Sequence, residues 1–325
     1  MISRRQFLAI VSACLLASPI AAEAQKVYRV GILLQGSPSA PGPGILVKAL
    51  SESGYIEGRN TVFDRRGAEG KSERFSSLAA ELVALKPDTI VADTTPAVVA
   101  AMRATTTIPI IMMNVADPVG SGLVSSLARP GGNVTGVADL STDMGVKGVE
   151  LLHAVAPKTT RLAVLMTDNP AHPPMLKAIQ DAARSVGLTV LPTKVRAPEE
   201  FEEAFASMAK QNAGALIVLG GAPLQGTQSQ RDKLVALAVK NKLPTFARAR
   251  GWPDSGGLLS YGPPLAPRLR LAATYVEKIL KGAKPGDLPV QQVTEFELII
   301  NLKTAKALGL TIPQSVLIRA NEIIE

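Results

Sequence analysis

The sequence is poor in the residues on which most catalytic and metal chemistry depends. It has one cysteine, two histidines and one tryptophan, and aromatic residues make up only 4% of it. Without Cys14, which lies in an apolar N-terminal segment, the chain can form no disulfide, thiolate nucleophile or cysteine metal site. His153 and His172 are at no spacing typical of metal ligands, so we interpret both as structural or solvated. We therefore expect no metal site, no cofactor and no catalytic residue.

Long runs of one charge are also missing. Lysine and arginine total 35 against 27 acidic residues, which gives a net charge of +8. These basic residues are scattered, with no run of five or more, so nucleic acid is not an expected partner. A net positive charge that is spread in this way instead favours anionic ligands or surfaces.

The N-terminus has the order of a secretory signal peptide, predicted over residues 1–24. A basic start at 1–6 precedes an apolar run at 7–20, which is shorter than the roughly 20 residues that span a bilayer. Residues 3–8 resemble a twin-arginine export signal, with an ordinary Sec signal as the open alternative. The apolar run continues past Cys14, which argues against a lipid anchor. No later segment is long and apolar enough to cross a membrane, so we predict a periplasmic protein.

Three enzyme-like motifs fail when their spacing is checked. A phosphate loop at 69–72 would need glycine where Arg65 stands, and a dinucleotide fingerprint at 42–44 would need glycine in place of Val47. No G-x-S-x-G elbow occurs. These failures argue against nucleotide-dependent and serine-hydrolase chemistry.

Strand-like and helix-like segments alternate along the chain in two rounds, which predicts an α/β fold of two Rossmann-like lobes with parallel sheets. Strands are expected at 28–34, 61–65, 88–92, 108–113, 161–166, 188–195, 215–219, 243–247 and 296–300. Helices are expected at 72–85, 199–211, 228–240, 265–280 and 302–308, with a further one ending at 186.

Glycine-rich segments at 131–136 and 256–262 are the expected crossings between the lobes. The N-terminal lobe is predicted to comprise 25–135 and 262–288, and the C-terminal lobe 136–261 and 289–325. The chain would then cross a hinge more than once.

The loops that follow the predicted strands are the candidate binding site, because ligands of open parallel sheets sit at the carboxyl ends of strands. These loops are rich in hydroxyls, amides and carboxylates that suit the carboxylate and ammonium of an amino acid. Helix N-termini after 94–95 and after 169 add N–H donors, although the same residues could be only helix caps. The candidates from the loops are Gln35, Ser37, Asn114, Asp168, Gly221 and Arg250. Trp252 and Tyr261 could cover an apolar ligand or belong to the core.

Several segments resemble one family, the ABC transporter substrate-binding proteins that include tryptophan- and other aromatic-amino-acid-binding members. The matching segments are GYIEGRN at 54–60, AAELV at 79–83, IPI at 108–110, DPVGSGLV at 117–124, LARPGGNVTG at 127–136, GGLLSYG at 256–262 and IINLKTA at 299–305. The resemblance implies a type I periplasmic-binding-protein fold whose lobes close around a ligand. By position, it implies ligand contacts at Thr94, Thr95, Asp117, Asn169 and Tyr261. The first loop, 35–44, departs from the family pattern because it is rich in proline and glycine.

These observations predict an extracytoplasmic receptor that binds a small molecule, expected to be an amino acid, for an ABC permease in the inner membrane. The resemblance suggests the aromatic amino acids among them. One alternative is a sensory subunit that feeds a membrane kinase. Another is a periplasmic enzyme, but the nucleophile–base pair or metal cluster that it requires is missing from the sequence.

Overall fold

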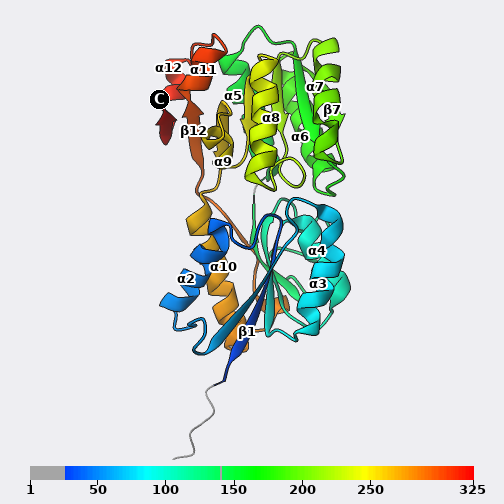
Figure 1. Ribbon diagram of the computed structural model, residues 1–325, viewed down its shortest axis with the longest axis vertical. Helices are drawn as coiled ribbons and strands as arrows, with labels where there is room; N and C mark the ends of the chain where they lie inside the picture. The colour runs from blue at the N-terminus through cyan, green and yellow to red at the C-terminus, as the bar shows by residue number, and fades with distance from the viewer. Residues whose placement is uncertain (1–25, 140) are drawn as a thin grey trace, which may run out of the picture.

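The apolar runs of the sequence assemble into two separate sheets, one in each of two lobes stacked end to end (Figure 1). The structure is a computed structural model that describes residues 26–139 and 141–325. The expected signal peptide, its cleavage site and Cys14 lie outside the described residues.

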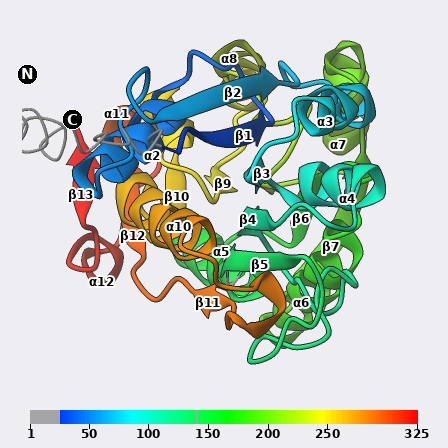
Figure 2. The same ribbon diagram turned by 90° about the horizontal axis from the view of Figure 1, so that it is seen from below.

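The N-terminal lobe contains a six-stranded, wholly parallel sheet with the order β11-β5-β4-β3-β1-β2 among the described residues. Its strands are β1 (Tyr28–Leu34), β2 (Thr61–Gly67), β3 (Thr89–Asp93), β4 (Ile110–Val115), β5 (Val134–Ala138) and β11 (Gln291–Gln292). Helices α2 (Pro41–Glu52) and α10 (Leu265–Leu280) cover one face, while α3 (Phe75–Ala84) and α4 (Thr95–Ala104) cover the other (Figure 2). Both faces are therefore buried, and this explains the unbroken apolar run of β1.

The two faces of this lobe are filled by alternate residues of the same strand. Ile32 packs with Leu46 and Leu269 on the α2 and α10 side. Leu33, its neighbour in β1, belongs to the cluster that contains Leu82 of α3. Successive side chains point to opposite sides of a strand, so β1 joins the two apolar layers of the lobe.

The C-terminal lobe repeats this arrangement in a seven-stranded sheet with the order β13-β12-β10-β9-β8-β6-β7 among the described residues. Its strands are β6 (Arg161–Met166), β7 (Thr189–Lys194), β8 (Ala215–Val218), β9 (Thr245–Ala247), β10 (Leu259–Gly262), β12 (Glu297–Asn301) and β13 (Glu322–Ile324). All neighbours run parallel except β10 and β12. The segment β7-β6-β8-β9-β10 has the same order as β2-β1-β3-β4-β5, which confirms two similar α/β lobes.

Helices again cover both faces of this second sheet. The longer ones are α5 (Ser141–Val155), α6 (His172–Ser185), α7 (Phe201–Lys210) and α8 (Gln228–Lys240). The shorter ones are α9 (Gly251–Asp254), α11 (Leu302–Ala307) and α12 (Gln314–Leu317), and 3₁₀ turns occur at Ser72–Arg74, Pro198–Glu200 and Pro285–Asp287. One apolar cluster joins α5 and α6 to the sheet, and another joins α7 and α8 to its opposite face. No described helix combines the length and apolar character that a membrane-crossing segment needs.

The chain passes between the lobes after β5, after β10 and after β11. The first passage comes later than the boundary expected at 135/136, because β5 continues in the N-terminal sheet to Ala138. Gly136 belongs to this strand rather than to a linker. Its φ is +129°, and a Cβ at this position would lie 2.5 Å from the Met112 carbonyl oxygen, so the strand requires glycine here. β11, at 291–292, likewise joins the N-terminal sheet rather than the C-terminal lobe.

A candidate ligand site between the two lobes

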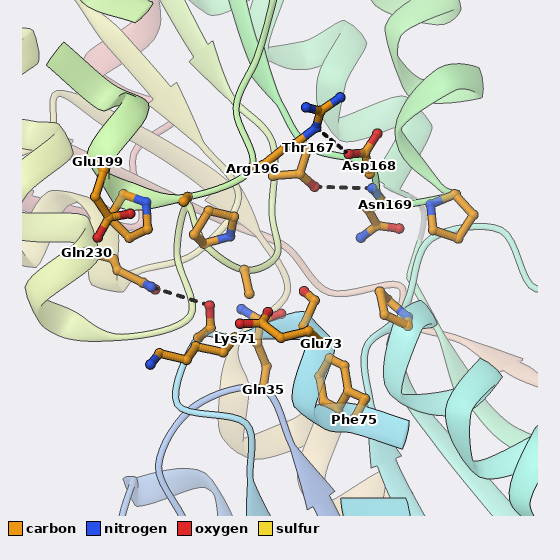
Figure 3. Close-up of a pocket in the computed structure, with 18 residues that line it drawn as sticks. Gln35, Lys71, Glu73, Phe75, Thr167, Asp168, Asn169, Arg196, Glu199 and Gln230 are labelled. Carbon is orange, nitrogen blue, oxygen red and sulfur yellow. Dashed lines mark hydrogen bonds and ion pairs between the residues drawn. The ribbon is translucent and has the colours of Figure 1, made fainter. Parts of the chain in front are cut away.

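The carboxyl ends of the parallel strands of the two sheets face each other across a cleft that contains adjoining cavities. The central one, here called the inner cavity, has a volume of about 430 Å³. A smaller one of about 280 Å³, the side cavity, has apolar walls from β1, α2 and α10. An outer cavity of about 550 Å³ forms the mouth of the cleft (Figure 3). Gln35, at the end of β1, lines all three.

Most of the predicted loop residues converge on this cleft. The inner cavity is lined by Gln35, Thr94, Thr95 and Asn114 from the N-terminal lobe, and by Asn169, Gly221 and Arg250 from the C-terminal lobe. Ser37 lines the side cavity and Asp168 lines the outer one. Strands of both lobes therefore direct these side chains to one place, as expected for open parallel sheets.

Asp117 and Tyr261 are not brought to these cavities. The Asp117 carboxylate accepts a hydrogen bond from the Gly120 N–H at 2.8 Å, so it stabilises a turn. Tyr261 stacks on Phe296 with ring centroids 5.4 Å apart and packs against the C-terminal core. Trp252 is fully buried, and its indole N–H donates to Thr245 Oγ1 at 2.9 Å. Both aromatic side chains thus have structural roles within the C-terminal lobe.

Thr94 is the most unusual residue of the N-terminal wall. It joins β3 to α4 with a φ of +86°, a region that side-chain-bearing residues rarely occupy. Its hydroxyl is buried and has no hydrogen-bond partner among the described residues. It lies at the N-terminus of α4, where backbone N–H groups and the helix dipole favour an anion. The strained backbone, the unused hydroxyl and the helix end together form a place for a ligand carboxylate.

A charged network connects the lobes behind the inner cavity. Arg248, which follows β9, donates from Nη2 to Asp139 Oδ2 at 2.5 Å and to Asn114 Oδ1 at 3.1 Å. Arg268 of α10 approaches the same carboxylate oxygen at 3.5 Å. Asp139 is 1% exposed, so this is a buried ion pair between side chains of different lobes. Burial lowers the pKa of Arg248, and the neighbouring Asp139 opposes that shift.

Asp93 lies beside this network at the end of β3. Burial raises the pKa of its carboxyl group, and Arg268 and a hydrogen bond from Asn114 Nδ2 at 3.3 Å act in the opposite direction. Asp93 lines the side cavity. It is therefore a weakly solvated acidic group at the edge of an apolar space.

His172 holds two strand-end loops of the C-terminal lobe together. It is the first residue of α6. Nδ1 accepts from the Thr167 N–H at 3.0 Å, and Nε2 donates to the Gly220 carbonyl at 2.8 Å. Burial lowers the pKa of this imidazole to about 4, so it is neutral near pH 7. This arrangement is a structural role, since both ring nitrogens are occupied.

The outer cavity is larger than the inner one, but its charged groups are exposed or already paired. Asp168 is half exposed and pairs with Lys194 and Arg196, and these partners lower the pKa of its carboxyl group. Figure 3 shows Asp168 and Arg196 turned toward each other, and it shows Gln230 reaching across to the N-terminal lobe. The inner cavity has more unused hydrogen-bonding capacity, so we take it as the ligand site.

Sequence reasoning selected Arg250 but missed three other arginines of the cleft, Arg231, Arg248 and Arg268, and the carboxylate of Asp139. Arg231 and Arg268 lie on helices, and Asp139 follows β5 where the chain leaves the N-terminal lobe. A search of the first helical turn after each strand-end loop would have found Arg231. Among residues 26–139 and 141–325, no cluster of histidine, cysteine and acidic side chains could hold a metal ion.

A two-lobed α/β architecture with a polar cavity between facing strand ends defines a solute-binding protein of the periplasmic type. Residues 42–324 match the family described as ABC transporter substrate binding protein, and the chain belongs to that family. This is a family of binding proteins rather than enzymes, as the failed catalytic motifs predicted.

Named relatives support this placement. A tyrosine-binding protein of Clostridioides difficile (strain R20291) is 33% identical over 266 residues, covering 81% of this chain and 75% of the relative. A domain from Streptococcus pneumonia solved in complex with L-Trp is 29% identical with a TM-score of 0.83, covering 92% and 100% of the two chains. A conserved domain protein from Vibrio cholerae has the same identity and coverage and a TM-score of 0.85.

A further relative indicates the conformation of the present structure. The ligand-free, open structure of a substrate-binding protein with adhesive properties from Clostridium difficile is 28% identical and covers 92% of this chain and 99% of its own. Its TM-score is only 0.64, against 0.83 for the tryptophan complex at nearly equal identity and coverage. In the present structure, Gln230 Nε2 donates to the Gly70 carbonyl of the opposite lobe at 3.4 Å. The lobes are therefore arranged more nearly as in the complex than as in the open form.

Proposed function

We propose that this protein is the extracytoplasmic receptor of an ABC importer, which binds an amino acid between its lobes and presents the closed form to a permease of the inner membrane. The observation that carries the proposal is the inner cavity, with a buried, unpartnered Thr94 hydroxyl at the N-terminus of α4. This arrangement suits the α-carboxylate of an amino acid. Relatives that bind tyrosine and tryptophan support the amino-acid class.

Closure provides the signal in this proposal. Thr94 belongs to one lobe and Asn169 to the other, so a ligand that contacts both stabilises the closed arrangement. The population shift can be no larger than the difference in ligand affinity between the closed and open forms. A permease that reads the closed form would then respond to the loaded receptor.

The test is a thermal-shift screen followed by isothermal titration calorimetry. The purified protein is freed of carried-over solute by partial unfolding in urea and refolding, and then exposed to the twenty amino acids and small carboxylates. A binding solute raises the melting temperature by mass action. Uptake of the same radiolabelled solute should fall in cells that lack the gene. Absence of any stabilising solute, or unchanged uptake, would contradict the importer role.

A further inference from the structure

Buried polar atoms that lack hydrogen-bond partners concentrate around the inner cavity. Of the six such atoms among the described residues, Thr94 Oγ1, Arg231 Nε and Arg248 Nε belong to residues that line this cavity, and a fourth, Asp139 Oδ1, belongs to the ion pair behind it. Buried polar groups of folded proteins are normally hydrogen-bonded, so a cluster of exceptions indicates a partner that binds there. The two nitrogens are donors on cationic side chains, which points to an acceptor of negative charge.

Arg231 is the cation of this set without a carboxylate partner. It lies in the first turn of α8 and lines both the inner and the side cavity. Among the described residues no carboxylate oxygen lies within 4.0 Å of its guanidinium group, whose one hydrogen bond goes from Nη1 to the Gln225 carbonyl at 3.3 Å. Burial lowers its pKa, with Asp232 and Asp254 acting in the opposite direction from a greater distance.

The backbone is shaped to hold this guanidinium against the cleft wall. A Cβ at Gly251 would lie 3.0 Å from Arg231 Nε and 3.2 Å from its Cζ. The group therefore rests closely on the glycine at the start of α9. Its position is set by packing rather than by a counter-ion.

The other arginines of the cavity have protein partners. Arg248 and Arg268 share the Asp139 carboxylate. Arg250 pairs with Glu322, at 2.7 Å for Nη2 and Oε1, and with Asp254 at 3.5 Å. The hydrogen bond with Glu322, together with Asp254 and Glu297 of the cavity wall, raises the pKa of Arg250. Among the described residues, Arg231 is thus the arginine of the cavity wall that no carboxylate pairs with directly.

We propose that the solute bound in the inner cavity carries two carboxylates and a net negative charge, as dicarboxylic acids and acidic amino acids do, and that Arg231 is the residue that selects it. This inference rests on the proposed function and narrows its substrate class. One carboxylate binds at Thr94 and the N-terminus of α4, and the other binds the Arg231 guanidinium. Each lobe then holds one acidic end of the solute.

Net charge separates this ligand from tyrosine and tryptophan. A zwitterionic amino acid has no net charge, so its single carboxylate cannot satisfy both the Thr94 region and Arg231. Among the described residues that line the inner and side cavities there is no phenylalanine, tyrosine or tryptophan, and the aromatic ring present is the His172 imidazole, whose nitrogens are both hydrogen-bonded within the C-terminal lobe. The cavities thus offer an aromatic ligand no phenylalanine, tyrosine or tryptophan ring to stack on, while they offer an anion a partly buried guanidinium.

The experiment compares solutes that differ only in one charge. Affinities of the refolded protein for L-glutamate and L-glutamine, for L-aspartate and L-asparagine, and for succinate and succinamate are measured by calorimetry, with L-tyrosine and L-tryptophan alongside. At least one acid should bind about 10- to 100-fold more tightly than its amide, the difference typical of a charge-assisted hydrogen bond. Equal affinities within every pair, or binding of tyrosine or tryptophan alone, would overturn the inference and leave the receptor function standing. Binding of nothing in the panel would overturn both.

Variants test whether Arg231 is responsible for the preference for an acid over its amide. Arg231→Gln should remove most of the acid-over-amide preference and leave the amide affinity within about 3-fold, because only a contact to the second carboxylate is lost. Lys233→Gln, a matched charge change two residues along α8 at an exposed position, should leave both affinities unchanged. If Arg231→Gln weakened acid and amide equally, Arg231 would be holding the Gln225 loop instead, and the selective role would be wrong.

Discussion

The two lobes share one strand order but meet the ligand site with different chemistry. The N-terminal lobe contributes a hydroxyl, amides and a helix N-terminus, through Thr94, Gln35 and Asn114. The C-terminal lobe contributes most of the guanidinium groups, from Arg231, Arg248 and Arg250, while Arg268 of α10 comes from the N-terminal lobe and pairs with Asp139. A repeated topology therefore determines where strand ends meet, and the residues placed on each copy determine what they bind. The lobes depend on each other, because Asp139 of one neutralises Arg248 of the other.

The strongest way to break this dependence is Asp139→Ala. It leaves Arg248 buried and unpaired at the lobe junction, so we expect the free energy of unfolding to fall by roughly 3–5 kcal/mol. Urea denaturation monitored by circular dichroism measures the change. Asp181→Ala removes an exposed carboxylate that pairs with Lys177 at 2.7 Å, and should leave the free energy of unfolding nearly unchanged because solvent screens the pair. Equal costs for the two variants would show that the interlobe pair contributes nothing beyond a surface contact.

Acid should weaken the C-terminal lobe through His172. Burial lowers the pKa of this imidazole from 6.5 to about 4, so the unfolded chain binds a proton that the folded one does not. The contribution of His172 to the free energy of unfolding should therefore be constant above pH 6.5. It should decrease by about 3 kcal/mol as the pH falls to 4. Denaturation midpoints at several pH values, compared with those of His172→Gln, test this. A variant with the same pH dependence as the natural protein would refute it.

A methyl group placed between the lobes should impede their approach. A Cβ at Gly226 would lie 2.8 Å from the Gly70 Cα of the opposite lobe. Gly226→Ala should therefore lower the affinity for the solute identified by the panel about tenfold, which corresponds to about 1.4 kcal/mol against closure. Small-angle scattering of the loaded protein should show a larger radius of gyration. Gly132→Ala, where nothing lies within 4 Å of the added atom, serves as the control and should change neither quantity.

The smallest effect concerns the strained residue of the N-terminal wall. Thr94→Gly relieves the positive φ and should raise the free energy of unfolding by about 1 kcal/mol. The same change removes the unused hydroxyl, so ligand affinity should fall about 3- to 10-fold. Thr94→Ser keeps the hydroxyl and should keep the affinity. If Thr94→Gly lowered both the free energy of unfolding and the ligand affinity, the positive φ of Thr94 would not be a strain that serves ligand binding.

Much of this architecture could be predicted from apolar patterning. The strand at 28–34, the strand at 161–166, and the helices at 228–240 and 265–280 have their expected bounds. The main miss was β5, where the glycines of residues 131–136 were interpreted as a linker. Patterning does not distinguish a glycine required by the close approach of a neighbouring strand, as at Gly136, from one in a flexible connection.

The site was predictable to the level of loops rather than side chains. The strand-end rule directed attention to Gln35, Thr94, Asn114 and Asn169, which line the inner cavity. The family resemblance implied a further contact from Tyr261, whose ring stacks within its own lobe. The strand-end rule could not find Arg231, since that position is set by how α8 packs on Gly251, a contact between segments whose proximity the sequence alone does not reveal.

The close contact between Gly226 and Gly70 bears on how the ligand selectivity of the cleft can change during evolution. Glycines bring main chain to main chain, so this part of the closing surface has few rotamers to immobilise and little entropy to lose when the halves meet. Its fit does not depend on which solute is enclosed. Substitutions of the cavity walls could then retune selectivity while the closing movement stays the same.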